Sequence, residues 1–137
     1  MNLPELKIGK LVAQVPIIQG GMAIRLSTAP LAAAVANEGG IGLIAASGMG
    51  LDELRKEIRM ARELTGGKGI IGINAMVAAR QFLDLITTAA EEGIDLIVAG
   101  AGFSRDIFAV GKKYGVEVVP IVSSARLAQT AEKLGAS

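Results

Sequence analysis

Five short apolar runs, each followed by a segment with helical periodicity, recur about every 20 to 30 residues along the chain. The runs begin near positions 15, 41, 70, 96 and 116, and each ends in small or polar residues. Continuous apolar runs of this length are typical of buried parallel strands, and the spacing is that of one strand-helix unit. The repeat predicts an α/β fold, either an open doubly wound sheet or part of an eight-stranded barrel. The periodicity is the same in both architectures.

The boundaries of the elements follow from the same pattern. Strands are expected at 15–20, 41–46, 70–76, 96–100 and 116–122, although Pro120 is unusual inside a strand. Helices are expected at about 31–38, 51–65, 79–92, 105–114 and 125–134, and each of them is followed by a glycine. Either Ser27 or Thr28 is expected to cap the first helix. Residues 1–14 form a lead-in that is expected to cover the bottom of the sheet.

Composition limits the size of the fold and the classes of function. A chain of 137 residues with 51% apolar and 3% aromatic residues is expected to form one domain over 1–137 with an aliphatic core. The net charge of +1 gives no electrostatic case for nucleic acid or for an anionic membrane. No apolar stretch approaches the length of a membrane span, and no leader peptide is recognised, so a cytoplasmic protein is expected.

The residue types that are absent are also informative. The sequence contains no His and no Cys, and the predicted strand ends contain no embedded acidic residue, although Asp95 and Asp106 flank the fourth strand. The usual general bases and metal ligands are therefore not where this architecture would place them. The nucleotide-binding patterns GxGxxG with a downstream acid and GxxxxGK[ST] are missing as well.

Two strand ends carry candidate ligand-binding residues. Gly20, Gly21 and Met22 follow the first strand, where paired glycines form either a plain turn or a close approach to a flat ligand. Asn74 is an amide inside an otherwise apolar strand, and an unpaired amide there costs about 1–3 kcal/mol. It is therefore either bonded to neighbouring backbone or presented to a polar ligand.

Two further positions have two possible roles each. Ser123 and Ser124 follow the fifth strand and either donate hydrogen bonds to a ligand or cap the last helix. Arg25 comes soon after the glycine turn and is expected either at the mouth of the site or on the surface.

Several segments, taken together and in order, resemble the nitronate monooxygenase family. They are Pro-Ile-Ile-Gln-Gly-Gly-Met at 16–22, residues 31–42, Ile-Gly-Ile-Asn at 71–74, residues 92–102, and Val-Pro-Ile-Val-Ser-Ser at 119–124. The resemblance covers nearly all of residues 4–135. This family was formerly called 2-nitropropane dioxygenase, and the FMN-dependent enoyl-acyl-carrier-protein reductases are its close relatives. Its members are FMN-binding (β/α)₈ barrels of the TIM-barrel type.

The resemblance implies a set of cofactor-binding residues. The turn at Gly20, Gly21 and Met22 would lie against the isoalloxazine ring of FMN, and Ala46 would line the mouth of the barrel. Asn74 would bond the polar edge of the flavin, and Ser123 would lie near the ring or the ribityl chain. No metal site is implied.

The resemblance also implies that the chain corresponds to the first five of eight strand-helix units. The family's catalytic His, in an Ala-Gly-Gly-His segment, would lie beyond residue 137, so no catalytic residue is expected here. The expected activity of the whole enzyme is oxidation of alkyl nitronates. The alternatives are NAD(P)H-dependent reduction of an enoyl thioester, or a non-catalytic half-barrel that serves as a scaffold. A partial barrel has open edges, so we expect self-association or pairing with a missing C-terminal half.

Overall fold

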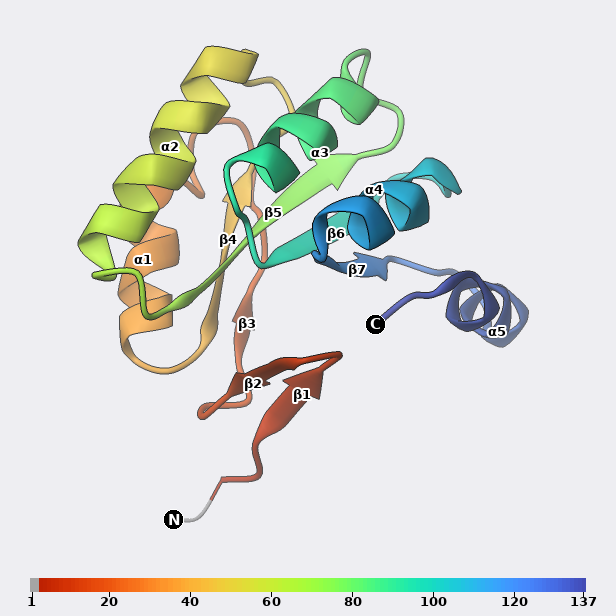
Figure 1. Cartoon of the computed structure of the whole chain (residues 1–137), viewed down its shortest axis with the longest axis horizontal. Helices are drawn as coiled ribbons and strands as arrows, with labels where there is room; N and C mark the ends of the chain where they lie inside the picture. Colours follow the sequence, from red (N-terminus) through yellow and green to blue (C-terminus); the bar gives the residue numbers. More distant parts are fainter. Residues whose placement is uncertain (1–2) are drawn as a thin grey trace.

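The computed structural model describes residues 3–137; residues 1 and 2 of the predicted lead-in lie outside the described part (Figure 1). A short antiparallel hairpin is formed by β1 (Leu6–Ile8) and β2 (Leu11–Ala13). The main sheet consists of β3 (Ile18–Gln19), β4 (Ile41–Ala45), β5 (Ile70–Met76), β6 (Leu96–Gly100) and β7 (Glu117–Pro120). The helices are α1 (Ala29–Asn37), α2 (Leu51–Leu64), α3 (Phe82–Glu91), α4 (Asp106–Tyr114) and α5 (Ala125–Leu134).

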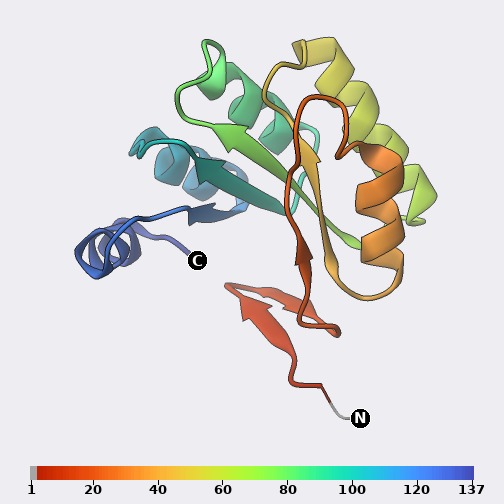
Figure 2. The same ribbon diagram turned by 180° about the vertical axis from the view of Figure 1, so that it is seen from behind.

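The order of the strands distinguishes the two architectures that the sequence left open. The five strands are parallel and stand in the order β3-β4-β5-β6-β7, so each pairs with the strand next to it in sequence. A doubly wound sheet reverses its order at one point and places helices on both faces. Here the order never reverses, and α1 to α4 cover a single face (Figures 1 and 2). The prediction of a barrel-type fold with five strand-helix units is confirmed.

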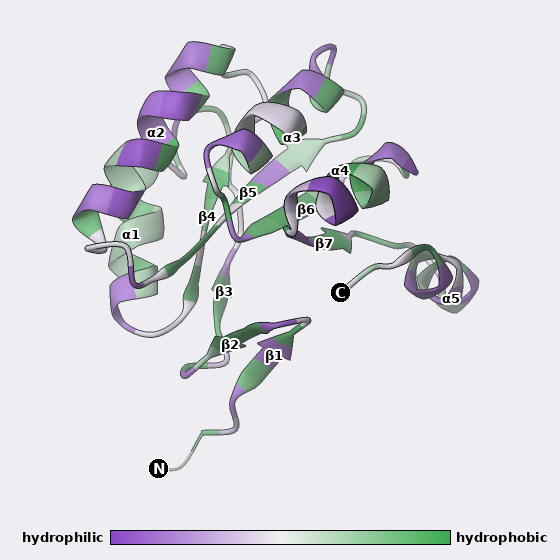
Figure 3. Ribbon diagram, viewed as in Figure 1, coloured by the Kyte–Doolittle hydropathy of each residue, from purple (hydrophilic) through white to green (hydrophobic). Residues whose placement is uncertain are grey.

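The helix-covered face contains the larger part of the core. Ile44, Ile73 and Ile97 point from the central strands toward the helices and are fully buried. Helix α1 packs directly on β4. The contact leaves no room for a side chain at position 42, since a Cβ added at Gly42 would lie 1.9 Å from the carbonyl oxygen of Ala32. Figure 3 shows mainly hydrophobic strands beside helices α2 to α5, in which hydrophilic and hydrophobic residues are mixed.

The opposite face of the sheet is closed at its amino end by the hairpin. Ala13 of β2 is buried with Ile41, Leu43 and Leu96 of the sheet. The backbone N–H of Lys10, in the hairpin turn, donates to Oε1 of Glu117 at 3.0 Å. The lead-in therefore covers the bottom of the sheet as predicted, and the carboxyl ends of the strands stay uncovered by it.

Several elements are shorter than predicted, among them the strand predicted at 116–122, and two of the differences have a clear local reason. The predicted strand at 15–20 shrinks to β3, because the N–H of Ile17 bonds back to the carbonyl of Val15 and does not join the ladder. The predicted helix at 79–92 begins only at Phe82, because the N–H of Ala79 closes a turn onto the carbonyl of Met76.

Pro120 is accommodated at the open edge of the sheet. It is the last residue of β7, opposite Ala99, and β7 pairs on one side only with β6. The next residue, Ile121, donates its N–H to the carbonyl of Ala99. Since alternate residues of a parallel strand bond the same neighbour, the missing N–H of Pro120 falls on the edge away from β6.

Candidate functional site

A cleft of about 590 Å³ lies at the carboxyl ends of β4, β5 and β6, which we call the strand-end cleft. This is the end of a parallel α/β sheet at which ligands bind. Its walls are mainly apolar or small, and Arg80 is the only charged residue among them. The lining residues are Gly21, Ala23, Ile24, Ala45, Ser47, Gly48, Asn74, Met76, Ala79, Arg80, Gly100, Ala101 and Ile121.

Asn74 and Gly21 meet inside this cleft. A Cβ added at Gly21 would lie 2.5 Å from the Cβ of Asn74, so only a glycine allows the turn after β3 to approach β5 this closely. Within residues 3–137, every fully buried side-chain N or O atom has a hydrogen-bond partner. The side-chain amide of Asn74 has no partner among these residues, so it is not fully buried. The amide therefore faces the open cleft with both its donor and its acceptor available.

The turn that carries Gly21 is held by Ser27. The side chain of Ser27 is fully buried, and its Oγ accepts the N–H of Met22 at 2.8 Å and donates to the carbonyl of Gly20 at 3.2 Å. Gln19 adds a bond from its Nε2 to the same Oγ at 3.1 Å. The Oε1 of Gln19 also accepts the N–H of Leu43 at 3.2 Å, which ties the turn to β4.

This role of Ser27 was missed by the sequence reasoning, which considered it only as a helix cap. The N-cap of α1 is Thr28, whose side chain makes no capping bond. A carboxylate from the next helix takes that place, because Oε2 of Glu57 accepts the N–H of Ala29 at 2.6 Å. The one available signal was Gln19, a polar residue in the apolar run before the glycine turn.

The backbone of the cleft is locally strained. Ala23, Arg25 and Ala101 have φ angles of 43°, 59° and 52°, in the left-handed region that L-residues rarely adopt. All three follow the carboxyl end of a strand, and Ala23 and Ala101 line the cleft. Strained residues of this kind concentrate at functional sites.

The other predicted cofactor residues take different positions. The carbonyl of Gly20 is engaged by the hydroxyl of Ser27, and Met22 is 43% exposed at the edge of the turn, outside the cleft lining. Ala46 is fully buried in the helix-side core, so its side chain does not line the mouth. Successive side chains in a strand point to opposite faces, and it is Ala45 that faces the cleft.

In the segment after β7 and the turn after β3, the structure distinguishes the alternatives that the sequence left open. Ser123 is exposed and does not line the cleft, where Ile121 contributes instead. Ser124 is the N-cap of α5 and accepts the N–H of Leu127 at 3.2 Å. Arg25 turns away to a bidentate pair with Glu53, with N–O distances of 2.8 and 3.0 Å, and this pair lowers the pKa of the Glu53 carboxyl.

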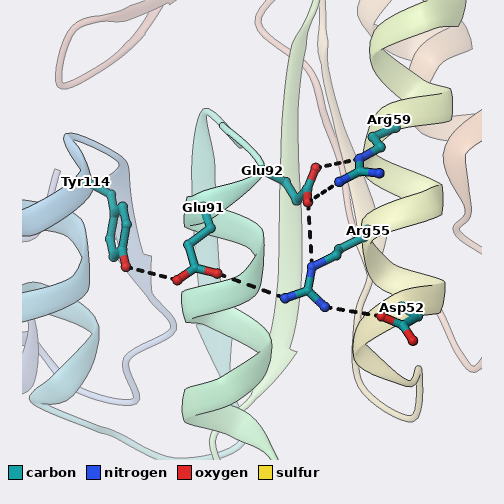
Figure 4. Close-up of polar contacts among 6 residues, drawn as sticks. All are labelled: Asp52, Arg55, Arg59, Glu91, Glu92 and Tyr114. Atoms are coloured by element: carbon teal, nitrogen blue, oxygen red, sulfur yellow. Dashed lines mark hydrogen bonds and ion pairs between the residues drawn. The ribbon is translucent and has the colours of Figure 1, made fainter.

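Most of the other charged side chains that form ion pairs do so on the helix layer. Figure 4 shows Arg55 and Arg59 of α2 reaching Glu92 at the end of α3, at 3.6 and 2.7 Å. The same network continues through Glu91, which accepts the hydroxyl of Tyr114 at 3.3 Å. None of its members lines the strand-end cleft. The network is therefore a structural link between α2, α3 and α4.

Over residues 3–137, no group of three His, Cys, Asp or Glu side chains converges in a way that could hold a metal ion. No helix in the same range combines the length and the apolar character needed to span a membrane.

Comparison with known proteins gives consistent matches. A family model described as nitronate monooxygenase matches residues 5–95. FabK from Thermotoga maritima superposes with a TM-score of 0.82 at 36% identity, over 88% of this chain and 38% of that one. A nitroalkane oxidase from Streptomyces ansochromogenes has the same fold, with a TM-score of 0.78 at 22% identity over 90% of this chain and 45% of the other.

A curated relative from Mycobacterium tuberculosis is 29% identical over 121 residues, which are 88% of this chain and 33% of the relative. Its name is (3aS,4S,5R,7aS)-5-hydroxy-7a-methyl-1-oxo-octahydro-1H-indene-4-carboxyl-CoA dehydrogenase. The chain thus spans between a third and a half of the length of these relatives.

Proposed function

This chain belongs to the nitronate monooxygenase family, and from that membership we propose that it forms the FMN-binding part of an oxidoreductase that oxidises alkyl nitronates. The single observation that carries the proposal is the unpaired amide of Asn74 in an apolar cleft at the carboxyl end of the sheet. Both features are independent of the family match.

The residues of the cleft fit the chemistry of a flavin. An isoalloxazine ring has apolar faces and a polar edge with donors and acceptors, and its bound form supplies a two-electron acceptor. Gly21 leaves the space beside Asn74 that a larger residue would fill, and apolar side chains such as Ile24 and Ile121 would contact the faces of the ring. Asn74 would bond the polar edge of the ring. Contacts from Gly20, Met22, the backbone near Ala46, and Ser123 stay predictions.

The family resemblance assigns the catalytic base to a His, and this sequence contains none. We expect the chain to bind FMN weakly and to show no turnover by itself. The cytoplasm is the proposed compartment, which agrees with the absence of Cys.

A second candidate function is reduction or oxidation of an acyl thioester. The observation in its favour is the curated relative, whose name specifies a CoA thioester as its substrate. The cofactor site proposed for the chain is the same in both cases. A non-catalytic half-barrel scaffold is the remaining alternative, and it predicts no flavin binding.

A titration of the purified chain with FMN tests the proposal. We expect saturable quenching of flavin fluorescence at micromolar FMN. In the Asn74→Ala variant we expect the dissociation constant to rise about tenfold, because one amide that bonds the ring would be lost.

Asn37→Ala is the matched control, since Asn37 lies on α1 and donates to the carbonyl of Leu64 away from the cleft. It should leave the affinity for FMN unchanged. Absence of saturable quenching by a chain that is folded by circular dichroism would refute the flavin site and favour the scaffold.

A further inference from the structure

Arg80 is the only charged residue in the wall of the strand-end cleft. It lies in the segment between β5 and α3, which is fixed by two backbone bonds: Val77 N–H to the carbonyl of Gly100 at 2.8 Å, and Ala79 N–H to the carbonyl of Met76 at 2.9 Å. The residue is exposed at the rim, while its neighbours Ala79 and Met76 also line the cleft. Its position is thus set by the sheet as well as by its own turn.

Of the other arginines that follow the carboxyl ends of the strands, Arg25 is paired with Glu53 at 2.8 Å, and Arg105 and Arg126 do not line the cleft. In the part of the chain that the structure describes, Arg80 forms no ion pair and no hydrogen bond, and the cleft wall contains no acidic residue that could neutralise it. A cation at the rim of an apolar cleft without a counter-ion raises the local concentration of anionic ligands.

We propose that Arg80 binds the anionic oxygens of the substrate, which makes it a specificity-determining residue of the cleft. This inference rests on the proposed function, because it assumes that FMN occupies the floor at Asn74. A guanidinium presents two parallel N–H donors, which match the paired oxygens of a nitronate or of a phosphate. The two sources of such oxygens are the nitronate itself and the phosphate of a thioester carrier.

The test has two stages. First, FMN is titrated into the wild-type chain and the Arg80→Gln variant, and we expect equal affinities. Second, the FMN-loaded chains are titrated with propyl-1-nitronate and, separately, with 4′-phosphopantetheine, and binding is followed by the flavin difference spectrum and by calorimetry.

For the ligand that the site accepts, we expect Arg80→Gln to weaken binding about three- to tenfold, and Arg80→Lys to weaken it less because the charge remains. Raising the salt concentration should reduce the difference, because the side chain is exposed. Arg126→Gln on α5 is the matched control, outside the cleft wall, and should change nothing.

The outcomes separate the two proposals. No FMN binding by the wild-type chain refutes the proposed function. FMN binding with ligand affinities that do not depend on Arg80 refutes this inference alone, as does an Arg80→Gln variant that loses FMN instead of the ligand. A preference for nitronate over 4′-phosphopantetheine, lost in Arg80→Gln, identifies the nitronate as the source of the anionic oxygens.

Discussion

The hydroxyl of Ser27 determines the shape of the glycine turn beside Asn74. It accepts hydrogen bonds from Met22 and Gln19 and donates one to Gly20, and Ser27 itself is fully buried. A buried hydroxyl with this many bonds cannot be removed without leaving donors unpaired. Ser27 therefore supports the candidate cofactor site although it does not line the cleft.

Replacement of Ser27 by Ala tests this role. We expect the free energy of unfolding to fall by about 1–3 kcal/mol, because the N–H of Met22 loses its partner. FMN affinity should fall as well, since the turn at Gly21 becomes less ordered. Denaturant titration and the FMN titration are the two measurements.

The control for this variant is Ser123→Ala, in which an exposed serine is lost. Its stability should stay within about 0.5 kcal/mol of the wild type. If Ser27→Ala were as stable as this control, the hydrogen bonds to Ser27 would not hold the turn.

At the residue scale, some residues of the candidate site could be predicted from the sequence and others could not. Asn74 could be singled out because an amide is conspicuous in an apolar strand, and Gly21 because of its position at the strand end. Ala45 and Ala46 could not be told apart, because a shift of one residue at a strand end exchanges the two faces of the sheet. Ser27 could not be recognised because its partners are reached through an irregular turn.

At the scale of elements, α2 and α3 are joined by the ion pairs around Glu92. Its carboxylate accepts two hydrogen bonds from Arg59, at 2.8 and 2.7 Å, and lies 3.6 Å from Arg55. The hydrogen bonds from Arg59 lower the pKa of Glu92 below its ordinary value, and the charge of Arg55 adds to this effect. Glu92 is therefore a stronger acid in the folded chain than in the unfolded one.

This difference predicts a pH dependence of stability. The contribution of Glu92 is fully present above the unfolded pKa of about 4.3 and is lost as the pH falls through the lower folded pKa. We expect the melting temperature to decrease on acidification below about pH 5, and to decrease less steeply in Glu92→Gln. Thermal unfolding followed by circular dichroism at several pH values measures this.

Glu132→Gln on α5 is the matched control, and its acid limb should follow that of the wild type. Parallel acid limbs for Glu92→Gln and the wild type would contradict the assigned role of the network.

The elements themselves could largely be predicted, while their assembly could not. The boundaries of β4 to β6 and of α2 follow from apolar runs, helical spacing and terminal glycines. The order of the strands depends on pairings between distant residues, and the same local pattern serves a doubly wound sheet and a barrel. The start of α3 was missed because the bond from Ala79 to Met76 closes a turn that competes with the helix.

At the scale of the whole molecule, the face of the sheet opposite the helices is open and apolar toward the carboxyl ends of the strands. Ile24, Met76 and Ile121 are 66%, 48% and 57% exposed there or at its rim. In the described chain, β3 and β7 each pair on one side only, apart from the bonds of Ser137 to Val118. We propose that another copy of the chain, or a C-terminal half, covers this face.

If another copy of the chain covers this face, the purified chain should self-associate. We expect the sedimentation coefficient to rise with protein concentration, and to rise less in Ile121→Lys, which places a charge on the apolar face. Leu83→Lys is the matched control, because Leu83 is exposed to a similar degree on α3 in the helix layer. A monomer at every concentration would contradict association between copies.

The consecutive order of the strands also determines how stability against unfolding varies along the sheet. Each strand-helix unit pairs only with the units before and after it, so the stability of the sheet approximates a sum of unit terms and nearest-neighbour interface terms, as in linear repeat arrays. The terminal unit of β7 and α5 has one such interface, and opening there costs less than opening at β5. Among residues 3–137, the bond from Lys10 to Glu117 joins positions 107 apart and links the hairpin to this terminal unit. Lys10 therefore gives the terminal unit a second attachment, through the hairpin, besides its interface with β6.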